Sequence, residues 1–324
     1  MPPHAMFGTT PTAEFGVNRP HVPPLGLDAP WPSYATLLAV DRTRLSNVGR
    51  RFRLKWAMSR IRRYQDVVDA AVRSSPWVWK TLQRHPILFR PLTSGFLDAR
   101  LNNQCRAEAF AYDLRFTSTY VQGAFPRFFP TQLQAPLCVD LPQCYTLILD
   151  LNLDHPQEGL WRLSLQNVDE RIFSVCFSVL PGPEIFIGGV QGGRSTALAN
   201  MVEQIRAATK AFEGIRPHFL LVDVIRTLAA AWNAKTIRGI PSRLQLKVRS
   251  GGRGRAGVRF SYDEFFQDLG AVATPDDLWA IPTTTMDRDI SDVPSRKRAM
   301  YRRRKVLLDH LRKAVRSHWL VETG

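Results

Sequence analysis

The sequence of 324 residues has little cysteine and no long hydrophobic run. Its four cysteines, Cys105, Cys138, Cys144 and Cys176, match no zinc or CxxC redox spacing, so we expect reduced thiols and no metal. The longest apolar stretches fall far short of the roughly 20 residues that cross a bilayer. These absences argue against a disulfide scaffold, a zinc module and a helical membrane-spanning protein.

Common nucleotide-binding and hydrolase signatures are missing as well. No Gly-Lys-Ser or Gly-Lys-Thr follows a glycine turn, and the three-glycine dinucleotide fingerprint is absent. No Ser-His-Asp constellation is readable, and we expect His85, His155 and His218 to be ordinary structural residues. Residues 1–40 are rich in proline and lack the pattern of a signal peptide, which predicts a disordered tail and a cytoplasmic protein.

Acidic residues are outnumbered by basic ones, 28 to 44, which gives a formal net charge of +16. The excess is concentrated in two segments. Arg50 to Arg63 has seven basic residues and no acid, and Arg296 to Arg316 has ten against the single Asp309. Concentrated positive charge attracts nucleic acid, anionic lipid or acidic partners. Arginine-rich, solvent-exposed helix faces are also common in proteins encoded by GC-rich genomes, and they give the same pattern.

Both basic segments also carry apolar residues at helical spacing. In the first, Leu54, Met58 and Ile61 share one face, which fits a helix lying on a membrane surface and equally a helix packed on its own domain. The second predicts a docked amphipathic helix with a wet basic face. Its apolar residues are Met300, Leu307, Leu308, Leu311, Val315 and Trp319.

The apolar period changes along the chain and predicts an α+β fold. Residues 41–142 favour short helices, whereas four β-rich runs between Tyr145 and Gln191 have connections too short for parallel pairing. We therefore expect an antiparallel meander there, followed by a helix capped by Gly214, a second helix beginning at Pro217 and a return strand. The expected division is a tail over 1–40, a helical region over 41–142 and an α+β region over 143–320.

The turn after the fourth predicted strand is a candidate anion site. Glycine adopts backbone angles closed to other residues, and the start of the following helix leaves N–H groups that favour a negative charge. The candidate ligand- or phosphate-binding residues are Gln191, Gly192, Gly193, Arg194, Ser195 and Thr196. A ligand-free corner in the backbone is the alternative interpretation.

This meander, glycine turn and helix resemble the acyl-CoA site of the acetyltransferase (GNAT) superfamily. The resemblance implies that turn amides bind the pyrophosphate of an acyl-CoA cofactor. Gln191 fits the superfamily's pattern, but Arg194 and Thr196 stand where small residues are expected. Acyl transfer needs a general base and a proton donor. The candidate catalytic residues are Glu158, Asp263 and Glu264 as bases and Tyr262 as donor, and a turn or capping role explains each equally well.

A second resemblance covers the chain from about Arg84 to Leu311. The ordered segments "RHPILFRPL", "EGLWRLSLQNVDERIFSVCFSV", "IFIGGVQGG", "IRAATKAFEGIRPHFLLVDVIRTLAAAW", "FSYDEFFQDLGA" and "SRKRAMYRRRKVLLDHL" are similar to the VirK/YbjX family of bacterial proteins. Two departures are Phe266, where the family tends to have tryptophan, and the glycine-rich "RSGGRGRAG" just before it.

This resemblance implies the biological processes in which the protein takes part, but it implies no biochemical reaction. Family members are associated with virulence, envelope stress and resistance to antimicrobial peptides, and the DNA-damage response. Three hypotheses follow: an acyltransferase-like protein that binds acyl-CoA or another phosphorylated ligand, a nucleic-acid-binding protein, and a non-enzymatic protein peripheral to the anionic inner membrane.

Overall fold

The structure is a computed structural model of the whole chain, and it describes residues 34–40, 46–121, 134–137, 141–168, 170–193, 198–246, 261–284 and 289–319. Residues 1–33 of the predicted proline-rich tail lie outside the described residues. The last seven residues assigned to that tail form helix α1 (Tyr34–Val40), whose Leu37 is buried in the core.

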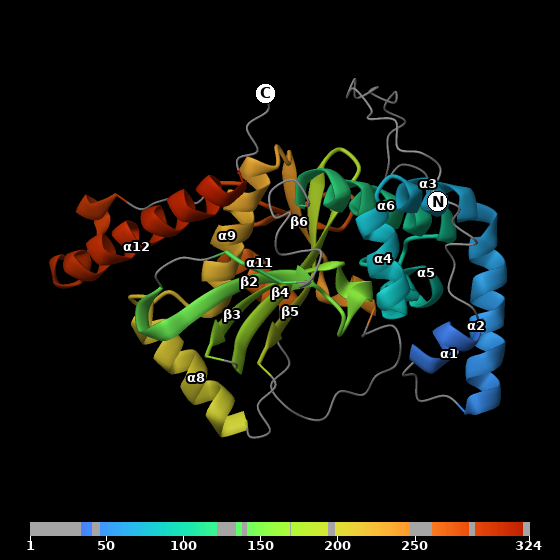
Figure 1. Cartoon of the computed structure of the whole chain (residues 1–324). Helices are drawn as coiled ribbons and strands as arrows, with labels where there is room; N and C mark the ends of the chain where they lie inside the picture. Colours follow the sequence, from blue (N-terminus) through green and yellow to red (C-terminus); the bar gives the residue numbers. More distant parts are fainter. Residues whose placement is uncertain are drawn as a thin grey trace.

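Short helices make up the N-terminal region and lie beside one end of the sheet (Figure 1). They are α2 (Asn47–Ile61), α3 (Gln65–Arg73), α4 (Pro76–Arg84), α5 (Arg90–Ser94) and α6 (Asn103–Phe116). Local sequence explains their starts. The side chains of Ser46 and Asn102 accept the N–H groups that open α2 and α6, and Pro76 occupies the first turn of α4.

An eight-stranded sheet forms the centre, with the order β1-β2-β3-β4-β5-β6-β8-β7. The strands are β1 (Gln134–Pro136), β2 (Tyr145–Leu151), β3 (Trp161–Asn167), β4 (Glu170–Leu180), β5 (Glu184–Gly192), β6 (Thr236–Gly239), β7 (Val272–Ala273) and β8 (Trp279–Ile281). All neighbours are antiparallel except β5 and β6, which are parallel. The predicted meander, β2 to β5, is confirmed, whereas β1, β7 and β8 were not predicted.

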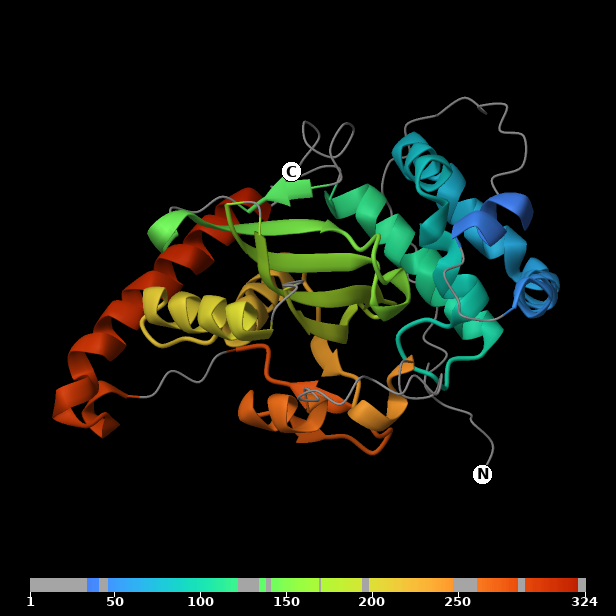
Figure 2. The same cartoon turned by 90° about the horizontal axis from the view of Figure 1, so that it is seen from below.

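Two helices connect β5 to β6 and explain why that pair is parallel, because a parallel connection needs a long crossover. They are α8 (Leu198–Ala211) and α9 (Pro217–Ala231). Gly214, with φ +80°, follows α8, and Pro217 opens α9, as the sequence predicts. Figure 2 shows this helical layer against the sheet, with the N-terminal helices at the sheet's end.

The basic C-terminal segment forms α12 (Ser295–Trp319), which packs along α9 (Figure 1). Leu311 and Val315 are buried, and Leu307 and Leu308 pack against the core. The predicted docked amphipathic helix is therefore confirmed. Most of its basic side chains are exposed, whereas Arg304 and Arg312 are partly buried and hydrogen-bond to Glu213 and Asp223.

The other basic helix, α2, is also packed on its own domain. Leu54 and Ile61 are buried, and Met58 packs against the core. Of the two interpretations of this apolar stripe, packing within the fold is the one that the structure shows. The same stripe is therefore not available to a membrane.

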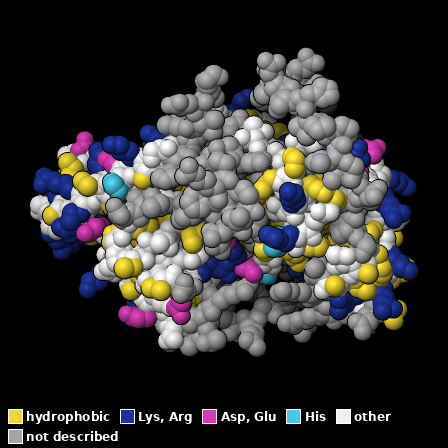
Figure 3. Space-filling view, viewed as in Figure 1, with side chains coloured by type: hydrophobic (Ala, Val, Ile, Leu, Met, Phe, Trp, Pro, Cys, Tyr) yellow, Lys and Arg dark blue, Asp and Glu magenta, His cyan; other side chains and the backbone are white. Residues whose placement is uncertain are grey.

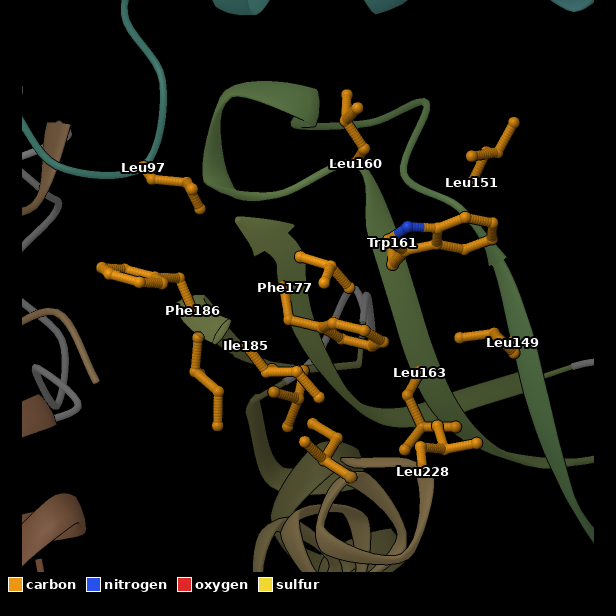
Figure 4. Packing of buried hydrophobic residues seen from close by; sticks show 14 of the residues in the cluster. Leu97, Leu149, Leu151, Leu160, Trp161, Leu163, Phe177, Ile185, Phe186 and Leu228 are labelled. Carbon is orange, nitrogen blue, oxygen red and sulfur yellow. The ribbon is translucent and has the colours of Figure 1, made fainter. Parts of the chain in front are cut away.

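One hydrophobic core joins the helical region to the sheet. The side chains of Leu163, Phe177 and Ile185 meet Leu228 of α9 on one face of the sheet (Figure 4). On that face Trp161 also donates its indole N–H to the buried carboxylate of Asp113 in α6, at 2.9 Å. The two regions therefore share packing and a buried hydrogen bond.

Candidate functional site

The opposite face of the same strands is polar although much of it is buried. Side chains alternate between faces along a strand, so register places residues in rows. One row runs Asp150, Arg162, Cys176 and Gly189, and the next runs Ile148, Ser164, Ser174 and Gln191. Burying a polar group costs folding free energy unless the group is hydrogen-bonded or ion-paired. The polar groups of this face therefore need partners within the fold.

An ion-pair network occupies the β2–β3 side of this face. Arg162 donates to both oxygens of Asp150 and also to Asp154, and Arg171 donates to Asp154 at 3.2 Å. Burial raises the pKa of Asp150, and the hydrogen bond from Arg162 limits that rise. Burial opposes the Arg162 charge, yet the hydrogen bond to Asp150 and the nearby carboxylates raise the pKa of Arg162. The network fixes the charged side chains in place.

Glu158 lies over the glycines of β5. It ends the turn Pro156–Glu158, and its side chain is buried, with 3% of the residue exposed. A β-bulge places Gly188 as an extra residue between the pairs Cys176↔Gly189 and Phe177↔Ile187. A side chain at either glycine would collide with Glu158, because a Cβ would lie 2.3 Å from the Glu158 carbonyl oxygen at 188 and 2.5 Å from its carboxylate at 189. The amide of Gln191 donates to the same carboxylate.

Tyr262 reaches this point from α11 (Tyr262–Asp268). Pairing between β5 and β6 ends at Ile187 and Gly239, and the Tyr262 hydroxyl then accepts the Val190 N–H at 3.2 Å. Burial, followed by the charge of Glu158, raises the pKa of the Tyr262 phenol. The phenol therefore keeps its proton across the ordinary pH range and lies within the electrostatic influence of Glu158.

The predicted turn residues are only partly described. Gln191 and Gly192 end β5, and Gly193 follows, but Arg194, Ser195 and Thr196 lie outside the described residues. The Gly193 N–H donates to the Ile172 carbonyl at 2.8 Å, so this amide is engaged by the protein itself. Because N–H directions alternate along a strand, the Gly192 N–H points to the same edge as that of Val190.

Asp263 and Glu264 do not join the group. The Asp263 carboxylate accepts the Trp279 indole N–H at 2.9 Å and the Ser242 N–H at 3.3 Å, which ties α11 to its neighbours. Glu264 is exposed at the start of α11, where its N–H is capped by Ser261. Phe266 is fully buried against Gly239 and has a packing role.

Of the four candidate catalytic residues, the structure thus brings together Glu158 and Tyr262, with Gln191 of the predicted turn. We define Glu158, Gln191 and Tyr262 as the β5 cluster. Sequence reasoning did not identify Asp150, Arg162 or Arg171, whose relation depends on cross-strand register. Among the described residues, no group of three or more His, Cys, Asp or Glu side chains is arranged to hold a metal.

None of the described helices is long and apolar enough to cross a membrane. The chain is 28% identical to a protein of Haemophilus influenzae over 82% of this chain and 87% of that protein. It is 26% identical to "Membrane protein LapB" of Mannheimia haemolytica, over 67% and 93% of the two chains. It is 25% identical to YbjX of Escherichia coli K12, over 51% of each chain.

No solved structure matches the chain. The family profile described as "Protein of unknown function (DUF535)" matches residues 43–317. With YbjX and LapB among its relatives, the resemblance to the VirK/YbjX family is confirmed. The chain belongs to the DUF535 family, which is the VirK/YbjX family.

Proposed function

We propose that the polar face of the sheet binds an acyl thioester such as acyl-CoA and that the protein transfers the acyl group to an amine or hydroxyl. The observation that carries the proposal is the β5 cluster. Its carboxylate, amide and phenol come from three distant segments and meet where β5 leaves β6. A buried carboxylate near a protonated phenol supplies the two proton-transfer groups that acyl transfer needs.

The strand arrangement supports this choice of ligand. Beyond Ile187, β5 is no longer paired with β6, and the Val190 and Gly192 N–H groups point to that edge. An extended chain that contains amides, such as the pantetheine arm of CoA, can add to a strand edge through main-chain hydrogen bonds. For that arm to pair with Val190, the Tyr262 hydroxyl must give up both of its hydrogen bonds to Val190, the one it accepts from the N–H and the one it donates to the carbonyl at 3.4 Å, and turn toward the ligand.

In the proposed reaction Glu158 is the general base and Tyr262 is the general acid. Glu158 takes a proton from the attacking amine or hydroxyl, whose lone pair forms a bond to the thioester carbonyl carbon. The carbon–sulfur bond then breaks, and Tyr262 protonates the departing thiolate. Glu158 returns its proton through solvent to the Tyr262 phenolate. The products are an amide or ester and a free thiol, and no oxidant or metal is consumed.

The family resemblance suggests where such a reaction acts. Family members are associated with envelope stress and with virulence, and one relative bears the name "Membrane protein LapB". We infer that the acceptor is an amine or hydroxyl of an envelope precursor at the cytoplasmic side of the inner membrane.

A thermal-shift titration with CoA, acetyl-CoA and a long-chain acyl-CoA tests binding. We expect at least one of them to raise the melting temperature, because a ligand that binds only the folded state stabilises it. Gln191→Ala and Glu158→Gln should abolish the shift. The matched control is Glu264→Gln, which changes an exposed carboxylate two residues from Tyr262 in α11 and should leave the shift intact.

Release of free thiol in the presence of amine acceptors tests the reaction itself. Tyr262→Phe should retain binding and lose most of the thiol release. No shift with any acyl-CoA, or shifts that are identical in wild type and Gln191→Ala, would overturn the proposed ligand. Binding without thiol release for any acceptor would leave a binding protein and overturn the transfer step.

A further inference from the structure

The outer face of α2 carries a second apolar stripe that nothing in the described fold covers. Val48, Phe52 and Trp56 are 78%, 75% and 54% exposed. They are spaced by four residues and so lie on one side of the helix, opposite the buried Leu54 and Ile61. Single exposed apolar residues are normal, but two large aromatic residues in a row on one helix mark an interaction surface.

Basic residues border this stripe on both sides. By helical spacing, Arg51, Lys55 and Arg62 flank it on one side and Arg60 flanks it on the other. Arg63 follows the C-terminal end of the stripe, in the turn Arg62–Tyr64, and all five basic residues are exposed. The Arg60 guanidinium stacks on the Trp56 ring at 3.9 Å. Among the described residues none of the five pairs with a carboxylate. Figure 3 shows blue and yellow side chains intermixed along the right-hand edge, where Figure 1 places α2.

The helix α12 is equally basic but uses its charges differently. Arg312 forms a double hydrogen bond with the buried carboxylate of Asp223 at 2.9 Å, and Arg303 pairs with Glu213 at 2.9 Å. Its exposed face has the isolated Val306, which is 69% exposed, and no aromatic stripe among the described residues. Part of the charge of α12 therefore holds the helix on the domain, whereas Arg51 and Arg60 of α2 are exposed beside the apolar stripe.

A basic groove begins where the apolar stripe of α2 ends. It has a volume of about 590 Å³ and lies between the end of α2 and the start of α6. Its lining includes Arg60, Arg63 and Arg106 with the amides of Asn102 and Asn103, and no carboxylate. Burial, then the charge of Arg60, lowers the pKa of Arg106. The Arg106 guanidinium donates to the Asn102 carbonyl at 3.3 Å and to the Asn103 side-chain oxygen, both of which are neutral acceptors. A bound phosphate would supply a negative charge.

We propose that α2 lies in the interface of an anionic lipid bilayer, with Val48, Phe52 and Trp56 at the boundary of headgroups and acyl chains and a lipid phosphate in the basic groove. An apolar stripe flanked by basic residues is the pattern of an interfacial helix, and the flanking charges complement anionic headgroups. Nucleic acid fits less well, because its phosphates would meet an apolar stripe at the centre of the surface. This inference is independent of the proposed acyl transfer.

Co-sedimentation of the full chain with vesicles tests the inference. We expect binding to phosphatidylcholine vesicles that contain phosphatidylglycerol and little binding to phosphatidylcholine alone. Replacing both aromatics (Phe52→Ser with Trp56→Ser) should lower the partition coefficient roughly ten-fold or more, because two exposed side chains no longer insert. Arg60→Ala with Arg63→Ala should lower it by about five-fold for each charge.

Two controls separate loss of membrane binding from loss of folding and from a general loss of charge. The replaced side chains are exposed, so melting temperatures should stay unchanged and show that each variant folds. The control variant on α12, Lys305→Ala with Val306→Ser, removes one exposed charge and one exposed apolar residue from the other basic helix and should bind vesicles as the wild type does.

Several results would overturn the inference. They are absence of binding to anionic vesicles, equal loss in the α12 control, and retention of binding in the double aromatic variant. A concentration-dependent dimer that the aromatic variant abolishes, without vesicle binding, would assign the face to a second copy. Gel-shift binding to duplex DNA without vesicle binding would assign it to nucleic acid. Stabilisation by inorganic phosphate without vesicle binding would reduce the groove to a free-phosphate site.

Discussion

The two faces of the central sheet are built from the same strands and differ in almost every other respect. On one face Leu163, Val175 and Phe177 are fully buried and meet α9. On the other, residues next to them in sequence, such as Arg162 and Cys176, form polar rows beneath Glu158. Alternation along a strand thus separates a face that stabilises the fold from the polar face that we propose binds a ligand. A buried polar surface costs stability, and such local costs are concentrated at functional sites.

The largest expected contrast is between Phe177→Ala on the apolar face and Ser174→Ala on the polar face. Phe177 is completely buried and its ring lies 6.2 Å from that of Trp232 in a tilted arrangement, so its removal should cost about 3–5 kcal/mol of unfolding free energy. Ser174→Ala removes one hydroxyl and should cost roughly 1 kcal/mol or less. Urea unfolding measures both. Equal losses would show that the two faces contribute alike to stability.

Asp113 of α6, buried against the end of the sheet beside Trp161, is an acid whose ionisation should oppose folding. Burial raises the pKa of Asp113 to about 7, against hydrogen bonds that include the one from Trp161. Between about pH 4 and 7 the folded protein therefore holds a proton that the unfolded chain has lost, so the free energy of unfolding falls as pH rises. Asp113→Asn should remove this fall and gain on the order of 2–4 kcal/mol at pH 8. Parallel stability curves for wild type and variant would contradict this.

His218, near Phe173 and Phe265 on the apolar face, should have the opposite pH dependence. Burial, then the charge of Arg216, lowers the pKa of His218 to about 4. As pH falls from about 6.5 to 4, the unfolded chain takes up a proton that the folded protein does not, so stability falls. His218→Phe keeps an aromatic ring and should remove roughly 2–3 kcal/mol of this acid sensitivity. An unchanged acid limb in denaturation curves at pH 4 to 7 would contradict it.

The smallest expected effect tests the close contact on the polar face. A Cβ at Gly189 would lie 2.5 Å from the Glu158 carboxylate, so Gly189→Ala should cost about 1–3 kcal/mol by crowding. Adding Glu158→Ala should restore part of the loss, because the crowded group is then gone. A double variant whose loss is the sum of the two single losses would show that the residues do not interact.

The sequence predicted the elements well where the apolar period was long and clear. The meander, the Gly214 and Pro217 boundaries and the docked α12 follow from periodicity and capping alone. Strands of two or three residues, such as β7 and β8, leave no such signal. The two helices between β5 and β6 make a parallel pairing of these strands possible. They do not determine which strand becomes the neighbour of β5, because that depends on packing in the whole fold.

The site was predictable in its parts but not as a group. Glu158, Gln191 and Tyr262 were each candidates by residue type, but their meeting depends on the register of β4 and β5 and on a contact across 72 residues. The polar row of Asp150 and Arg162 needs the same register. For α2, periodicity identified the stripe that is buried, and only the fold shows that Phe52 and Trp56 remain outside.

The most direct test of the polar face as a ligand site is hydrogen–deuterium exchange of the full chain with and without an acyl-CoA. We expect slower exchange in peptides that cover Gly188 to Gly192, Glu158 and Tyr262, and no change in peptides from α3 or α12. Unchanged exchange around β5 at saturating acyl-CoA, or protection confined to other parts of the chain, would contradict the claim that this face binds the thioester.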